Sequence, residues 1–142
     1  MTATPITSTA SAAAPVSSKS RVAGLVVTGL VVAFLLFDVV IHLANTQQVK
    51  DSMAEYGFPD HAPYVMGVVL LICLALYLIP MTSILGAVLI TGYLGGAVAA
   101  NMLTEQPLVG TTLFPVYVGI FVWGGLLLRD AEAREVMPFV HR

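Results

Sequence analysis

The chain has 142 residues, which suits a single domain. Hydrophobic residues make up 58% and charged residues only 10% of it, whereas roughly 25% of a typical globular domain is charged. The formal net charge is −2 and no dense basic patch occurs, which excludes an ordinary nucleic-acid-binding surface. Long uncharged stretches in this composition indicate a membrane protein.

Both ends of the chain differ in composition from the middle. Residues 1–20, MTATPITSTASAAAPVSSKS, are rich in Ser, Thr, Ala and Pro. Such a segment buries too little apolar surface to offset the entropy lost on ordering, so we predict a disordered cytoplasmic tail. Residues 131–142 carry mixed charges and include Pro138. They predict a short cytoplasmic helix or tail, with the charges on a solvated face.

Four apolar segments lie between these ends, at about 22–44, 62–79, 83–102 and 109–128. Each is close to the roughly 20 residues that cross a hydrocarbon core of about 30 Å. A backbone in lipid must satisfy its own hydrogen bonds, so the segments should be helices. The short connections between them make neighbours antiparallel. We therefore predict an all-α fold, an integral membrane four-helix bundle over residues 21–130.

The positive charges predict the orientation. Five of the six Lys and Arg residues flank the apolar region at its two ends: Lys19, Arg21, Arg129, Arg134 and Arg142. Lys50 alone lies in a loop on the other side. Because cytoplasmic loops carry an excess of Lys and Arg, both termini are expected in the cytoplasm. The loop of residues 45–61 then faces outward.

This outer loop contains a helical pattern of its own. Val49, Met53 and Tyr56 recur at helical spacing, Gly57 can form a left-handed C-cap, and Pro59 blocks continuation. We predict a short amphipathic helix at the outer surface. It can be a structured connector or a lid over a site, and both interpretations stay open.

Asp38, His42 and Asn45 follow one another on a single face near the outer end of the first segment. An ionised carboxylate in lipid costs ~3 kcal/mol, so Asp38 should face the bundle interior, a wet cavity or a partner. Other segments place polar side chains at the same depth: Tyr64, Asn101 and Tyr117. The six residues together predict a polar pocket that opens outward.

Two interpretations of this pocket are open. The residues can be ordinary interfacial side chains, with Asp38 and His42 as a structural clamp. Alternatively they form a binding or proton-handling site, since ionisable groups within membranes are functional candidates. Two residues on one helix do not define a reaction.

The third segment contains TGYLGGAVAAN, in which Gly92 and Gly96 form a GxxxG pattern that Gly95 and Ala99 extend. Small residues let helix backbones approach closely in lipid, so we predict a packing surface, within the bundle or between copies in a homo-oligomer. Cys73 is the only cysteine. No cysteine and histidine spacing predicts a metal site.

The segments LFDVVIHL, VKDSMAEYGFP, LYLIPMTSILGAVLITGYLGGAVAANM and LFPVYVGIFVWGGLLLRD together resemble the DoxX-like branch of the DoxX superfamily. The resemblance runs from about Phe34 to Pro138. It implies a four-span protein of the bacterial inner membrane and little chemistry. Relatives include a subunit associated with thiosulfate:quinone oxidoreductase and a protein linked to oxidative-stress defence. Relatives often carry Lys at His42 and Glu at Leu70, whereas Asp38 matches.

The leading functional hypothesis is an accessory membrane protein, more plausibly not an enzyme, in a redox or stress-response system. Its pocket would bind a small ligand or a partner helix in the bilayer. One alternative is a quinone-linked oxidoreductase subunit in which Asp38 and His42 relay protons. Another is a small-solute transporter. Nucleic acid is not an expected partner.

Overall fold

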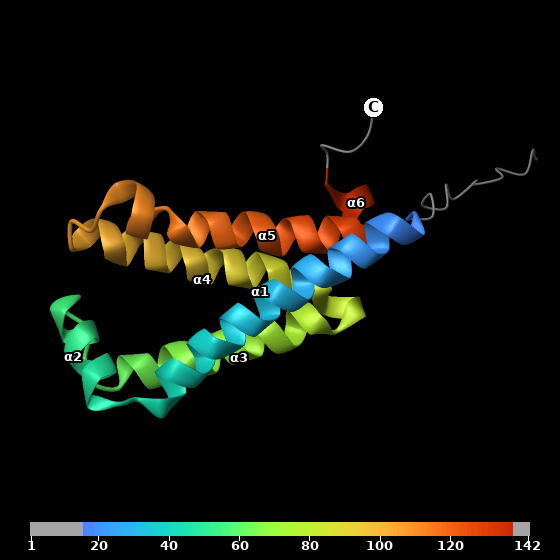
Figure 1. Ribbon diagram of the computed structural model, residues 1–142. Helices are drawn as coiled ribbons and strands as arrows, with labels where there is room; N and C mark the ends of the chain where they lie inside the picture. Colours follow the sequence, from blue (N-terminus) through green and yellow to red (C-terminus); the bar gives the residue numbers. More distant parts are fainter. Residues whose placement is uncertain (1–15, 138–142) are drawn as a thin grey trace, which may run out of the picture.

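The computed structural model describes residues 16–137, which are helical apart from short connections (Figure 1). The elements follow in chain order: α1 (Ser18–Ala44), α2 (Gln47–Glu55), α3 (Ala62–Leu78), the 3-10 turn η1 (Pro80–Thr82), α4 (Ser83–Leu103), the π-helical turn η2 (Leu108–Thr112), α5 (Phe114–Arg129) and α6 (Ala131–Val136). The predicted tail of residues 1–15 and the last residues, 138–142, lie outside this range.

Four of these helices form a ring. α1 packs between α3 and α5, and α4 packs between the same two helices from the other side. In residues 16–137, three helical stretches are long and apolar enough to cross a membrane, and α3 is a shorter apolar helix of 17 residues. The predicted all-α membrane bundle is confirmed, and α2 is the short helix expected in the first long loop.

The first helix begins earlier than predicted. Ser17 has an extended backbone and its hydroxyl oxygen accepts a hydrogen bond from the Ser20 N–H at 3.3 Å, which is an N-cap. The helix therefore starts at Ser18, so that residues 18–20 belong to α1 and not to a disordered tail. A serine-rich stretch suits a tail and a cap equally well, and composition does not separate the two.

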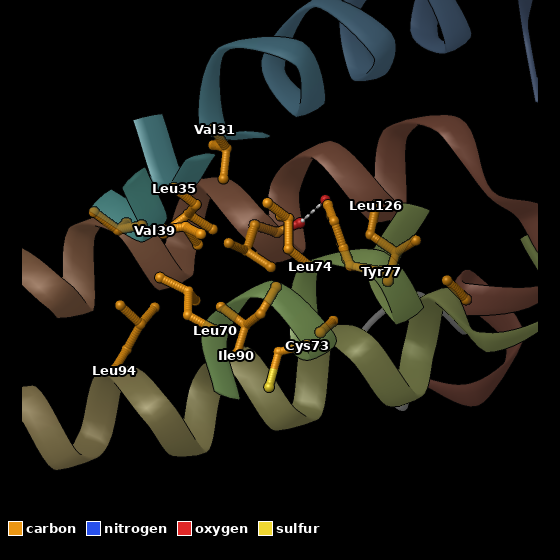
Figure 2. Packing of buried hydrophobic residues seen from close by; sticks show 14 residues of the cluster. Val31, Leu35, Val39, Leu70, Cys73, Leu74, Tyr77, Ile90, Leu94 and Leu126 are labelled. Atoms are coloured by element: carbon orange, nitrogen blue, oxygen red, sulfur yellow. Dashed lines mark hydrogen bonds between the residues drawn. The ribbon is translucent and has the colours of Figure 1, made fainter. Parts of the chain in front are cut away.

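The core lies along the axis of the ring (Figure 2). Leu35, Leu70 and Ile90 come from three different helices and are almost fully buried. Tyr77 is also buried, and its hydroxyl donates a hydrogen bond of 2.8 Å to the Val122 carbonyl oxygen (Figure 2). That bond satisfies a phenol that would otherwise lie unpaired in an apolar interior.

The outer surface of the bundle is apolar as well. Large side chains such as Phe37, Val40 and Ile120 are more than half exposed in the isolated chain. A water-soluble protein does not carry apolar surface on this scale, because exposed apolar patches of this kind drive association. The exposed side chains are those expected to face lipid.

Three glycines bring helices close together at the end of the bundle where α1 begins and α6 lies, called the terminal end below (Figure 1). A Cβ on Gly86 of α4 would lie 2.7 Å from the Leu76 carbonyl carbon and closer still to the backbone of Tyr77. Gly24 of α1 and Gly125 of α5 face each other's helices just as closely. The ring is therefore tightest at the terminal end.

Polar side chains close the same end. Arg134 of α6 donates to the Leu127 carbonyl oxygen and, at 2.8 Å, to the Ser20 hydroxyl oxygen. Ser20 in turn donates to the Leu128 carbonyl oxygen at 3.0 Å. Carbonyls at a helix C-terminus lack intrahelical partners, so these bonds cap α5 and tie it to α1. The mixed charges of residues 131–142 predicted a freely solvated face. Arg134 does not lie on such a face, because it bonds to α5 and α1.

Gly86→Ala should destabilise the bundle by roughly 1–3 kcal/mol, because the added methyl group must displace the α3 backbone. Gly92→Ala is the matched control in the same helix. An added Cβ there meets nothing within 4 Å, and alanine is favoured over glycine in helices by roughly 0.5–1 kcal/mol. Thermal unfolding followed by the fluorescence of Trp123 measures both. Equal midpoints for the two variants would contradict the assigned close contact.

Candidate functional site: a cavity beneath α2

A cavity of ≈ 440 Å³ lies at the opposite end of the bundle, called the α2 end below. This volume falls within the range of about 300–1,000 Å³ that is typical of small-molecule sites. Its walls come from all four helices of the ring, from α2 and from the turn after α2. The lining residues are Phe34, Leu35, Asp38, His42, Met53, Tyr56, Phe58, Met66, Tyr93, Leu94, Gly96, Ala97, Ala100, Asn101, Phe114, Pro115 and Val118. Most of these side chains are apolar.

α1 contributes Asp38 and His42, one helical turn apart. The His42 Nδ1–H donates to the backbone carbonyl oxygen of Asp38 at 2.9 Å. The same nitrogen lies 3.5 Å from the Asp38 carboxylate oxygen, a longer approach than that to the carbonyl. The hydrogen bond of the ring thus goes to the backbone, and the carboxylate is not held in a simple side-chain clamp. In the neutral ring, Nε2 is then an acceptor.

The Asp38 side chain is only partly buried. About 34% of its side chain is exposed, against 11% for His42, and both residues line the cavity. The carboxylate is therefore accessible from the cavity. This is the placement that the cost of burying a charge in hydrocarbon requires.

Tyr93 of α4 completes the polar group and was not predicted. Its side chain is partly buried, lines the cavity and lies close enough to the Asp38 carboxylate to interact with it. Tyr93, Ala97, Ala100 and Asn101 all line the cavity, at the i, i+4, i+7 and i+8 positions of one helix face. That spacing, counted back from Asn101, could have identified Tyr93.

Asn101 is the third predicted residue that lines the cavity. Its Nδ2 donates to the Thr111 carbonyl oxygen at 3.1 Å and so connects α4 to the π-helical turn that precedes α5. Tyr64 and Tyr117 do not line the cavity. Their side chains are 54% and 40% exposed, as interfacial aromatic residues would be.

Asn45 also lies outside the cavity lining, and it ends α1. Its φ of 44° is in the left-handed region, and its N–H donates to the His42 carbonyl oxygen at 3.2 Å. Asparagine tolerates this conformation better than most residues other than glycine. Its Oδ1 is buried with no hydrogen-bond partner in residues 16–137. Asn45 therefore terminates a helix, and its side chain is not one of the polar groups that reach the cavity.

α2 and the residues after it cover the cavity. Met53, Tyr56 and Phe58 all line it, whereas no residue of α2 is fully buried. Figure 1 shows α2 across the end of the bundle, joined to α1 and α3 by short turns. Gly57, with a φ of 77°, permits the sharp turn between Tyr56 and Phe58. The geometry agrees with both roles considered for this helix, connector and lid.

The predicted packing glycines make no close helix contact within residues 16–137. A Cβ on Gly92, Gly95 or Gly96 meets nothing within 4 Å, and Ala99 is exposed. Gly96 instead leaves space in the cavity wall, and Gly95 lines a second, apolar groove between α4 and α5. Packing of these residues against another copy of the chain stays a prediction.

Cys73 and the other possible metal ligands do not gather into a site. Among residues 16–137, no group of three His, Cys, Asp or Glu side chains is placed to hold a metal ion. Cys73 is free and buried in the core, outside the cavity lining. The side chains that line the cavity themselves offer hydrogen bonding, proton exchange and apolar contact.

Asn45→Gly should raise the unfolding midpoint, because glycine adopts the left-handed conformation freely and removes an unpaired buried oxygen. Asn45→Val should lower stability by roughly 1–2 kcal/mol, because a β-branched side chain clashes there. Ala44→Val, in the last helical position of α1, is the control and should change little. Calorimetry of the detergent-solubilised protein compares the three. Loss of stability in Asn45→Gly would show that the amide has a partner role.

Comparison with known proteins supports the architecture. The family model described as the DoxX-like family matches residues 26–125, which covers all four helices of the ring in whole or in large part. None of the curated proteins matches the chain, and neither does any solved structure. The match extends over more than two thirds of the sequence and includes Asp38, His42, Tyr93 and Asn101. The chain belongs to the DoxX-like family.

Proposed function

We propose that the protein binds a small amphipathic molecule in the cavity beneath α2, as an accessory component of a membrane redox or stress-response system. One observation carries the proposal: Asp38, His42, Tyr93 and Asn101 come from two helices and meet in a cavity with otherwise largely apolar walls. Ligand sites characteristically combine a mainly apolar lining with a few convergent polar groups.

The cost of this arrangement supports a role beyond folding. A carboxylate within a membrane bundle is expensive even when it is partly sheltered, and an apolar residue at position 38 would avoid that cost. The terminal end of the same bundle is closed by Tyr77, Arg129 and Arg134, whose hydrogen bonds reach neighbouring helices. Asp38 of α1 contacts Tyr93 of α4 through its side chain, a contact that a neutral residue could also make, so we attribute its charge to a ligand.

The quinone-linked alternative meets a hydrogen-bonding problem. A quinone ring presents carbonyl oxygens, which only accept hydrogen bonds. Of the polar side chains in the cavity wall, Asp38 is an acceptor when ionised, and neutral His42 has already used its N–H on a backbone carbonyl. Tyr56, Tyr93 and Asn101 are the donors that remain, Tyr93 lies beside Asp38, and one N–H of Asn101 binds Thr111. A quinone would bring no donor to the Asp38 carboxylate, so it fits the cavity less well than a ligand that itself donates.

Transport of a small solute would need a path through the bundle. The interior between the cavity and the terminal end is filled by Leu70, Ile90 and Val122, each fully buried. No described feature favours a continuous polar path, whereas the cavity favours binding.

Gly96→Leu should displace the bound molecule, because the new side chain enters the cavity wall, which is open at this position. Gly92→Leu is the matched control, one turn away on the same helix, exposed and outside the cavity lining. Both proteins are purified from native membranes and their bound small molecules are identified by mass spectrometry. A compound present in the wild type and in Gly92→Leu, but reduced at least tenfold in Gly96→Leu, is the expected result.

Two results would count against the proposal. One is recovery of the same compound from Gly96→Leu and the wild type in equal amounts. The other is a wild-type protein that carries only bulk lipid in the proportions of the membrane.

We further infer that the protein lies in the bacterial inner membrane with both termini in the cytoplasm. The basis is the positive-inside rule, since Lys and Arg flank the terminal end of the bundle and Lys50 alone lies at the α2 end. Cysteines placed at the exposed positions Gln48 and Glu135, in a Cys73→Ala background, test the orientation.

A membrane-impermeant maleimide added to intact spheroplasts should label Gln48→Cys at once. It should label Glu135→Cys only after the membrane is broken. The reverse pattern would invert the topology and place the cavity toward the cytoplasm.

A further inference from the structure

The polar groups of the cavity include a carboxylate, which only accepts hydrogen bonds when ionised. The Asp38 carboxylate has two acceptor oxygens, neutral His42 has Nε2 and the Asn101 amide has Oδ1, while one of the two Asn101 Nδ2 hydrogens is used on Thr111. The donors in the wall are the second Asn101 N–H and the hydroxyls of Tyr56 and Tyr93, and Tyr93 lies beside Asp38. None of these donors carries a charge, so a ligand that brings a donor or a positive charge to Asp38 complements the wall best.

The charged side chains around the cavity also favour a positively charged ligand. No Lys or Arg lines the cavity, and the basic side chain within 4.0 Å of the Asp38 carboxylate in the described residues is His42. The ring hydrogen of His42 is directed at a backbone carbonyl at 2.9 Å, and the carboxylate lies farther away, at 3.5 Å. A carboxylate in surroundings of low dielectric constant gains most from a cation in direct contact.

The wall also contains several aromatic rings. Five of the lining residues carry aromatic rings: Phe34, Tyr56, Phe58, Tyr93 and Phe114. Phe34 and Phe114 meet edge to face, with ring centroids 5.6 Å apart and an interplanar angle of 69°. Aromatic faces attract ammonium groups through their quadrupole, and the attraction grows when the site excludes water.

We propose that the ligand of this cavity is an amphipathic organic cation, an amine or quaternary ammonium compound. Its positive group lies against the Asp38 carboxylate and the surrounding aromatic rings. Its apolar part packs against Leu35, Met53 and Met66. The proposal rests on the function proposed above, that the cavity binds a small amphipathic molecule, and it specifies the charge of that molecule.

Two nearly isosteric probes separate charge from shape. Benzyltrimethylammonium carries one positive charge, and neopentylbenzene has the same shape with carbon in place of nitrogen. Binding of each is measured by calorimetry and by Trp123 fluorescence, with the full-length protein in nanodiscs of uncharged lipid. The wild type should bind the cation at least tenfold more tightly than the neutral probe.

Asp38→Asn should reduce this preference to less than threefold and leave the affinity for neopentylbenzene unchanged. Asp38→Glu should restore most of the preference, which separates loss of charge from loss of folding. Asp51→Asn is the control for a general charge effect, because Asp51 lies on α2, is exposed and is not part of the cavity wall. It should bind both probes as the wild type does.

The outcomes distinguish the two proposals. Equal affinity of the wild type for both probes would overturn the cation assignment and leave a binding cavity in place. A preference for the cation that survives in Asp38→Asn would remove the carboxylate from the assignment. No binding of either probe to the wild type would count against the cavity as a ligand site altogether. A neutral or anionic compound recovered from native membranes would overturn the cation assignment alone.

Discussion

The unequal spacing of the helices along the bundle is the constraint on which the rest of the structure depends. At the terminal end, Gly24 and Gly86 let helix backbones meet closely, and Gly125 of α5 leaves room for Thr28 of α1. Toward the α2 end, α1 and α3 stay together, because Gly67 of α3 faces the side chains of His42 and Leu43. α4 and α5 diverge from this pair (Figure 1), and the cavity lies in the space that results. Close helix packing at the terminal end is thus combined with a cavity at the α2 end.

The four apolar helices were predictable because lipid imposes one strong rule: a spanning segment must be long, apolar and helical. The end of the helix in the outer loop was also predictable, since Gly57 and Pro59 act through local backbone chemistry. The candidate site was predictable only in part. Asp38 and His42 were evident because a charge in an apolar run is rare, and Asn101 was placed by its depth in the membrane. All three line the cavity.

The residues that sequence reasoning missed or left open have a common physical origin. Tyr93 looks like any other aromatic residue of an apolar helix unless its helical spacing from Asn101 is used to fix the rotation of α4 about its axis. The same uncertainty affects the glycines. The GxxxG pattern at Gly92 and Gly96 has open space beside it, whereas isolated Gly86 carries the close contact between α3 and α4. A small residue permits a helix contact, but the partner helix decides which one is used.

The pairing of α1 with α5 has a consequence for the synthesis of the protein. α1 and α5, the first and last helices of the ring in sequence, are neighbours in space, and Thr28 of α1 lies against Gly125 of α5. Translation delivers the first of them long before the second. During that interval Asp38 lies in the nascent first crossing, while Tyr93, its neighbour from α4, is still to be made. The insertion machinery must therefore accept an acidic helix that has not yet found its partners, and the ring closes only when the last crossing leaves the ribosome.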